Sequence, residues 1–261
     1  MSPEPGLDPN RRRPDGPTVA LFVTCVVDQI APDVGVAAVR LLEAAGCRVE
    51  FPTAQTCCGQ PAANAGEPEA AGRLARHMID VFAPYDAVVA PSGSCAAMVH
   101  HSYDRLISGP DRVRAEELSA KTFELCQYLV DELGCTDVGA RLDATVTFHD
   151  ACHGLRNLGI GDAPRRLLTA AGVTLVDLAD SETCCGFGGT FSLEYGDLAA
   201  ALADDKLAHA SATGAEFLAS GDSACVAHLE GRRRRTGSGP EPIHVAELLA
   251  RGLPAPVSPT P

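Results

Sequence analysis

The chain has 261 residues, a formal net charge of −13 and 46% hydrophobic residues, enough for one or two domains whose cores need no disulfide staples. The acidic balance argues against a nucleic-acid partner, because phosphate binding needs a concentrated basic face. The longest apolar runs, about ten residues long, are too short to cross a bilayer, so no membrane span is expected.

Both ends of the sequence are rich in proline and lack apolar periodicity, which predicts a disordered arm over residues 1–17 and a disordered tail over residues 253–261. Between them, short apolar runs alternate with longer amphipathic stretches, as in β-α-β units around a parallel sheet. Strands are expected at 18–24, 48–51, 87–90, 145–149, 174–178 and 216–219. Helices are expected at 33–45, 67–82, 94–107, 121–133, 163–171, 191–213, 224–234 and 244–251.

The order of these elements is the same in the two halves of the chain. The predicted fold is therefore α/β, with two tandem Rossmann-like β-α-β repeats, parallel sheets and a pseudo-two-fold internal duplication. The repeats are expected over residues 18–137 and 138–252.

Eleven cysteines are too few for a secreted disulfide scaffold, and no secretory apolar segment follows the basic start of the chain. We therefore expect a cytoplasmic protein with reduced thiols. In such a compartment, thiols that recur at fixed spacing more often bind metal or carry out redox chemistry than form bridges.

The cysteines repeat together with the elements. Four positions recur at one constant offset, since Cys25, Cys57, Cys58 and Gly59 correspond to Cys152, Cys184, Cys185 and Gly186. The last cysteine of each set, Cys95 or Cys225, recurs at a slightly longer offset, which a loop can absorb. In each half the cysteines follow the first, second and third predicted strands, so four sulfurs should converge at the carboxyl edge of a parallel sheet, where open α/β folds bind ligands.

Clustered thiolates need a cation, and both iron–sulfur clusters and zinc favour cysteine ligands. Structural zinc sites usually pair their ligands across about two to four residues. Here the gaps from Cys25 to Cys57 and from Cys58 to Cys95 are many times longer. The spacing favours a larger iron–sulfur cluster held between strand ends, with zinc as the alternative.

Other residues near the repeated cysteines are candidates for contact with the bound group. Glycines there permit positive φ, so that backbone N–H groups can approach the sulfurs; these are Gly59, Gly186, Gly188 and Gly189. His149 and His153 flank Cys152 and could donate hydrogen bonds to a cluster or relay a proton. The cysteines outside the repeat are interpreted as core or near-core thiols, and they are Cys47, Cys126 and Cys135.

With these motifs the sequence resembles the cysteine-rich CCG domain family, which includes the heterodisulfide reductase B subunit and the glycolate oxidase iron–sulfur subunit. The pattern Cys-x31-Cys-Cys-Gly-x35-Cys, the stretch PSGSC at 91–95 and the stretch CCGFGGTF at 184–191 carry this resemblance. They are most similar to the lactate utilization protein A group. The similarity covers about residues 18 to 252.

The resemblance implies an iron–sulfur electron-transfer subunit of a multi-protein system that oxidises a 2-hydroxy acid, L-lactate, to pyruvate. It would work beside a ferredoxin-like iron–sulfur subunit and a third lactate-utilization subunit. The resemblance also implies cluster ligation by Cys25, Cys57, Cys58, Cys95, Cys152, Cys184, Cys185 and Cys225.

One departure from the heterodisulfide reductase pattern concerns the end of each half. Those proteins end each half in Cys-x-x-Cys, whereas Ser92 and Asp222 stand at the first of these positions here. Four thiolates per half favour a four-iron, four-sulfur cluster, in one half or both. Two other hypotheses stay open: a heterodisulfide reductase-like thiol/disulfide enzyme, and a zinc-binding scaffold or redox sensor. No Gly-x-Gly-x-x-Gly fingerprint follows a strand, so hydride chemistry would belong to a partner.

Overall fold

The computed structural model of the chain describes residues 16–255. Residues 1–15 of the predicted disordered arm and residues 256–261 of the predicted tail lie outside this range. Among the described residues, no helix combines the length and the apolar composition needed to cross a membrane.

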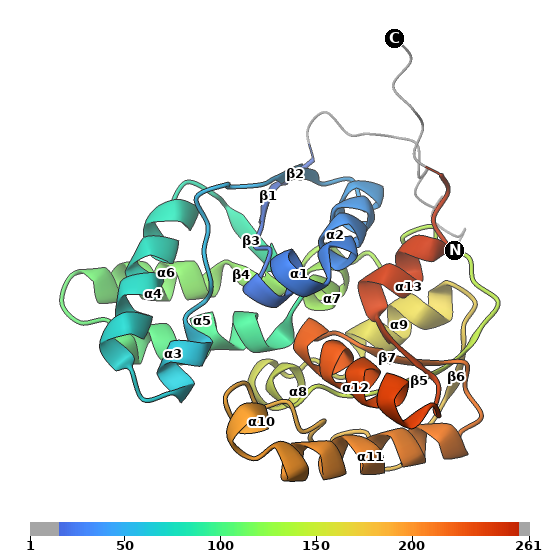
Figure 1. Ribbon diagram of the computed structural model, residues 1–261. Coiled ribbons are helices and arrows are strands. Elements are labelled where there is room, and N and C mark those ends of the chain that lie inside the picture. Colours follow the sequence, from blue (N-terminus) through green and yellow to red (C-terminus); the bar gives the residue numbers. More distant parts are fainter. Residues whose placement is uncertain (1–15, 256–261) are drawn as a thin grey trace.

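Two lobes follow one another along the chain, the first coloured blue to green and the second yellow to red in Figure 1. The first comprises, in chain order, β1 (Thr18–Leu21), α1 (Cys25–Ile30), α2 (Pro32–Ala44), β2 (Arg48–Glu50), α3 (Gln60–Asn64), α4 (Pro68–Phe82), β3 (Ala87–Ala90), α5 (Gly93–Leu106), α6 (Asp111–Ala120), β4 (Thr122–Glu124), α7 (Leu125–Gln127) and the π-helical turn η1 (Tyr128–Glu132). The second comprises β5 (Thr145–Phe148), α8 (Cys152–Leu158), α9 (Ala163–Ala170), β6 (Thr174–Val176), α10 (Phe191–Glu194), α11 (Gly196–Ala212), β7 (Phe217–Ser220), α12 (Ser223–Thr236), β8 (Glu241–His244) and α13 (Val245–Arg251).

Each lobe contains a four-stranded parallel sheet, and the two sheets have the same topology. The strand orders are β2-β1-β3-β4 and β6-β5-β7-β8, with every pairing parallel. The predicted fold class and internal duplication are therefore confirmed. In both sheets the first strand lies between the second and the third, so the three loops that carry the repeated cysteines leave neighbouring strands at one edge.

The amphipathic pattern of the helices explains how the sheets are covered. Helix α4 begins with proline at its first position, where the missing N–H costs nothing, and buries one face every three or four residues: Ala71, Ala75, Met78, Ile79 and Phe82. Strand β3, with the sequence Ala-Val-Val-Ala, is buried along its whole length because helices cover both faces.

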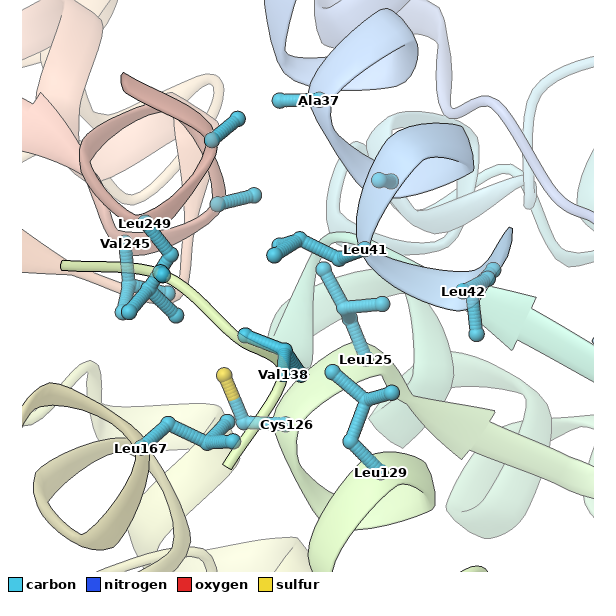
Figure 2. Packing of buried hydrophobic residues seen from close by; sticks show 14 of the residues in the cluster. Ala37, Leu41, Leu42, Leu125, Cys126, Leu129, Val138, Leu167, Val245 and Leu249 are labelled. Carbon is cyan, nitrogen blue, oxygen red and sulfur yellow. The ribbon is translucent and has the colours of Figure 1, made fainter. Parts of the chain in front are cut away.

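The largest hydrophobic cluster joins the two lobes. In Figure 2, Leu41 of α2, Leu125 of α7 and Leu249 of α13 come together, and helices α2 and α13 lie side by side. Cys126 lies in this cluster and is 1% exposed, while Cys47 and Cys135 are also buried there, as expected of core thiols.

Several expected elements differ from the observed ones. The helix expected over 121–133 begins with β4, and β8 was likewise not expected as a strand; both are three or four residues long, too short to show a clear period. The strand expected over 18–24 ends at Leu21, because the chain leaves the sheet to present Cys25 at the start of α1. The helix expected over 191–213 breaks at Tyr195, between α10 and α11.

Candidate metal centre

The repeated cysteines occupy equivalent places at the carboxyl edges of the two sheets. Cys25 and Cys152 are the first residues of α1 and α8, just after β1 and β5. The adjacent pairs lie in the loops after β2 and β6, and the last cysteines lie in the first turns of α5 and α12. Parallel strands end at a common edge, so the topology gathers four sulfurs in each lobe.

Sulfur atoms of each set are in contact in pairs. In the first lobe the Sγ atoms of Cys25 and Cys57 are 3.4 Å apart, and those of Cys58 and Cys95 are 3.6 Å apart. In the second lobe the Sγ atoms of Cys185 and Cys225 are 3.0 Å apart. These distances exceed the roughly 2.05 Å of a disulfide bond, and all eleven cysteines are free thiols.

The thiols of one set cannot all ionise by themselves. Hydrogen bonds from Cys25 and Cys58 lower the pKa of Cys57 to about 3, whereas the hydrogen bond to Cys57 and burial raise the pKa of Cys25. In the second lobe the pKa of Cys184 is lowered in the same way by Cys152 and Cys185. Bringing further thiolates together requires a cation, so the donor sets fit a thiolate-bound metal or cluster.

Both sets face one cavity between the lobes. The cavity has a volume of about 220 Å³, whereas a single water needs roughly 10–15 Å³. It is lined by seven of the eight repeated cysteines: Cys25, Cys58, Cys95, Cys152, Cys184, Cys185 and Cys225. The sequence predicts a thiol set in each half, but it does not reveal that the two sets share a cavity.

Gly186 shows why a glycine follows the cysteine pair. Its φ is +92°, and a Cβ there would lie 2.5 Å from the Ala199 carbonyl oxygen. Its N–H donates a hydrogen bond to Cys184 Sγ at 3.3 Å. The other glycines singled out from the sequence, Gly59, Gly188 and Gly189, also have positive φ.

The two histidines that flank Cys152 differ in environment. His149 is fully buried, and its Nδ1 lies 3.2 Å from the Ser181 carbonyl oxygen. Its ring also lies close to Cys185 and Cys225, with one potential ligand atom from each of the three residues within 4.8 Å of the others. His153 is half-buried, lines the cavity, and has its Nδ1 3.7 Å from Cys152 Sγ.

The residues at the departure from the heterodisulfide reductase pattern join the two lobes. Asp222 Oδ2 accepts hydrogen bonds from Ser94 N at 2.9 Å and from the Ser92 hydroxyl at 3.3 Å. Ser92 and Asp222 also form an isolated antiparallel β-bridge. This carboxylate therefore joins the lobes within the lining of the cavity.

Sequence reasoning missed three buried polar residues around the site. Glu124 and His244 are the last residues of β4 and β8, and their side chains accept hydrogen bonds from the first turns of the following helices. Lys206 is 2% exposed, and its Nζ donates hydrogen bonds to the carbonyl oxygens of Asp180 and Ser181. Glu124 and His244 could have been noticed in the sequence because each directly precedes the last helix of its half. Lys206 gives no such signal, because its sequence context is that of a surface residue.

Comparison with known proteins agrees with this architecture. The family described as "Cysteine-rich domain" (CCG) matches residues 19–100 and 146–230. Similar proteins include Lactate utilization protein A of Exiguobacterium sp., 46% identical over 91% of this chain and 98% of that protein, and Lactate utilization protein A of Geobacillus kaustophilus, 46% identical over 88% of this chain and 98% of that protein.

Among solved structures, glutamate racemase RacE1 from Bacillus anthracis matches at a TM-score of 0.40 and 12% identity, over 91% of this chain and 79% of that one. A likeness this low bears on neither fold nor function. One family match lies within each lobe, and each contains one complete set of four cysteines. The chain belongs to the cysteine-rich CCG domain family.

Proposed function

We propose that this chain is the iron–sulfur electron-transfer subunit of a multi-protein system that oxidises a 2-hydroxy acid, L-lactate, to pyruvate. The observation that carries the proposal is the meeting of the two thiol sets at one cavity, which seven of their eight cysteines line. Relatives that match nearly the whole chain are named Lactate utilization protein A, which supports the choice of substrate.

The proposed ligands in the first lobe are Cys25, Cys57, Cys58 and Cys95, and in the second lobe Cys152, Cys184, Cys185 and Cys225. A bound four-iron, four-sulfur cluster would accept and release one electron at a time. The chain would supply thiolates and the Gly186 N–H beside Cys184 Sγ. Donated hydrogen bonds of this kind stabilise an anionic cluster and tune its potential.

The electrons would pass between this chain and its partners. Oxidation of L-lactate to pyruvate releases two electrons and two protons, so a centre that takes one electron needs a second centre or a second transfer. Two thiol sets facing one cavity suit such a division. The proposed partners are a ferredoxin-like iron–sulfur subunit and a third lactate-utilization subunit.

A test follows from reconstituting the chain anaerobically with both partners and adding L-lactate. We expect an electron paramagnetic resonance signal of reduced clusters to appear in wild type and in Cys135→Ser, which changes a buried thiol outside the repeat. We expect Cys25→Ser to lose the part of this signal that comes from the first lobe, and Cys152→Ser to lose the part that comes from the second. A lactate-dependent signal that is unchanged in both of these variants would refute the proposal.

Thiol–disulfide chemistry is the second candidate, because Sγ atoms lie 3.0 to 3.6 Å apart in both lobes and face a cavity that a disulfide substrate could enter. Its test is reduction of a mixed disulfide by the pre-reduced chain. Activity that survives Ser substitution of both Cys57 and Cys58 and of both Cys184 and Cys185 would exclude these pairs as the reactive thiols.

A further inference from the structure

His149 is held rigidly at the carboxyl end of β5. Its backbone N–H donates to the Ala219 carbonyl at 2.8 Å, and its carbonyl accepts a hydrogen bond from the Ser220 hydroxyl at 3.1 Å. Its side chain is 0% exposed. The backbone bonds fix the position of its Cα, and complete burial leaves the ring little room to turn.

The hydrogen bond of Nδ1 determines what the other ring nitrogen presents. The Ser181 carbonyl oxygen, 3.2 Å from Nδ1, can only accept, so Nδ1 carries the hydrogen. In the neutral ring Nε2 then carries a lone pair. Within the part of the chain that the structure describes, Nε2 is buried and has no hydrogen-bond partner, a state that costs free energy unless something binds there.

The thiols of Cys185 and Cys225 lie beside the His149 ring, with one ring nitrogen and the two Sγ atoms within 4.8 Å of one another. Metal-bound histidines typically donate their other ring N–H to a carbonyl or carboxylate, which fixes the ring and its tautomer. His149 has both features: a ring fixed by Ser181 and a free nitrogen among thiols.

The first lobe has no equivalent nitrogen. Phe22 precedes His149 by the same offset that relates Cys25 to Cys152, and it makes the same backbone hydrogen bond, to Val89 at 2.9 Å. Its ring is 1% exposed and packs against Phe82, with the ring centroids 5.5 Å apart. The duplicated sites therefore differ at this buried position, which is apolar in the first lobe and has a ring nitrogen in the second.

We propose that His149 Nε2 is a ligand, with Cys185 and Cys225, of the metal centre in the second lobe. This inference rests on the proposed iron–sulfur function and refines its ligand set in the second lobe, where the nitrogen takes the place of one of the four cysteines named above. The first lobe then holds an all-thiolate centre and the second a mixed imidazole–thiolate centre. A neutral nitrogen in place of a thiolate leaves the centre less negative and raises its reduction potential, so electrons that enter the first lobe pass to the second.

The test uses the full-length chain, reconstituted anaerobically with iron and sulfide, after its iron and acid-labile sulfide have been counted. Pulsed electron paramagnetic resonance of the reduced protein, made with ordinary or ¹⁵N-labelled histidine, reports nitrogen bound directly to the cluster. We expect a strong, label-dependent coupling in wild type and in His153→Phe, and its loss in His149→Phe. The last variant gives the second lobe the residue that the first lobe already has.

A redox titration supplies a second readout. We expect two midpoint potentials in wild type, with only the higher one displaced in His149→Phe. If the chain binds iron and Cys152→Ser removes one centre, but wild type shows no strong histidine coupling, the assignment is overturned while the proposed function stands.

Absence of iron would instead refute the proposed function, and zinc-loaded protein would then decide the role of His149. X-ray absorption at the zinc edge should show nitrogen scattering in wild type, lost in His149→Phe. An all-sulfur zinc shell in wild type would overturn the assignment in that case as well.

Discussion

Glu124 and His244 form a matched pair of buried titratable residues with opposite expected effects on stability. They end β4 and β8 opposite Ala90 and Ser220, which are related by the same offset as Cys95 and Cys225. Burial raises the pKa of Glu124 to about 7, and burial lowers the pKa of His244 to about 4. Both side chains are therefore neutral in the folded protein at pH 6.

The signs follow from linkage between protonation and folding. The unfolded chain loses the Glu124 proton above about pH 4.5, so the contribution of Glu124 to the free energy of unfolding falls as the pH rises towards 7. The unfolded chain protonates His244 below about pH 6.5, so the contribution of His244 rises with pH over nearly the same window. Between pH 5 and 7 each changes by about 2 kcal/mol, and the two nearly cancel in wild type.

Glu124→Gln and His244→Asn expose the two terms separately, because each keeps an acceptor for the helix that follows. As the pH rises from 5 to 7, we expect the free energy of unfolding of Glu124→Gln to increase by about 2 kcal/mol relative to that of wild type. Over the same range, that of His244→Asn should decrease by about as much relative to wild type. The assay is urea denaturation of the reduced protein followed by circular dichroism, since the chain has no tryptophan. The reasoning would be refuted if the free energy of unfolding of both variants changed with pH in the same way as that of wild type.

Two further substitutions test the supports of the site by thermal denaturation. Gly186→Ala should lower the free energy of unfolding by several kcal/mol, because φ is positive there and the new Cβ would also clash with the Ala199 carbonyl oxygen. The control Gly214→Ala has positive φ but open space around it, and should cost only about 1 kcal/mol. Equal losses in the two variants would contradict the role of the clash. Arg165→Ala removes a guanidinium that makes two hydrogen bonds, at 2.7 and 2.8 Å, to the nearly buried Asp150, and should cost about 3 kcal/mol at pH 7; an effect below about 0.5 kcal/mol would mean that the carboxylate is solvated.

The sequence predicted the parallel α/β repeats because the constant offset of the cysteines coincides with alternating apolar runs. It could not predict β4 and β8, whose three or four residues carry no period and whose pairing depends on β3 and β7. Nor could it predict the shared cavity, which depends on how the lobes pack through α2 and α13. Lys206 lies within a helix that looks solvent-exposed in sequence, and only the fold shows that its Nζ binds the Asp180 and Ser181 carbonyls.

Ser92 and Asp222 bond to each other where this chain departs from the heterodisulfide reductase pattern. Where the heterodisulfide reductase pattern described under Sequence analysis has a further cysteine, this chain has a hydroxyl and a carboxylate that bond across the lobes. The proposed sets of four thiols are consistent with that exchange, since Asp222 already accepts hydrogen bonds from Ser92, Ser94 and Ala224.

The most direct test of the account is the iron and acid-labile sulfide content of anaerobically purified wild type, Cys25→Ser and Cys152→Ser, with Cys135→Ser as the control. We predict that each of the first two substitutions removes about one cluster's worth of iron and that the control removes none. Stoichiometric zinc with no iron in any of these proteins would contradict the electron-transfer account and leave the thiol sets as structural or sensory zinc sites.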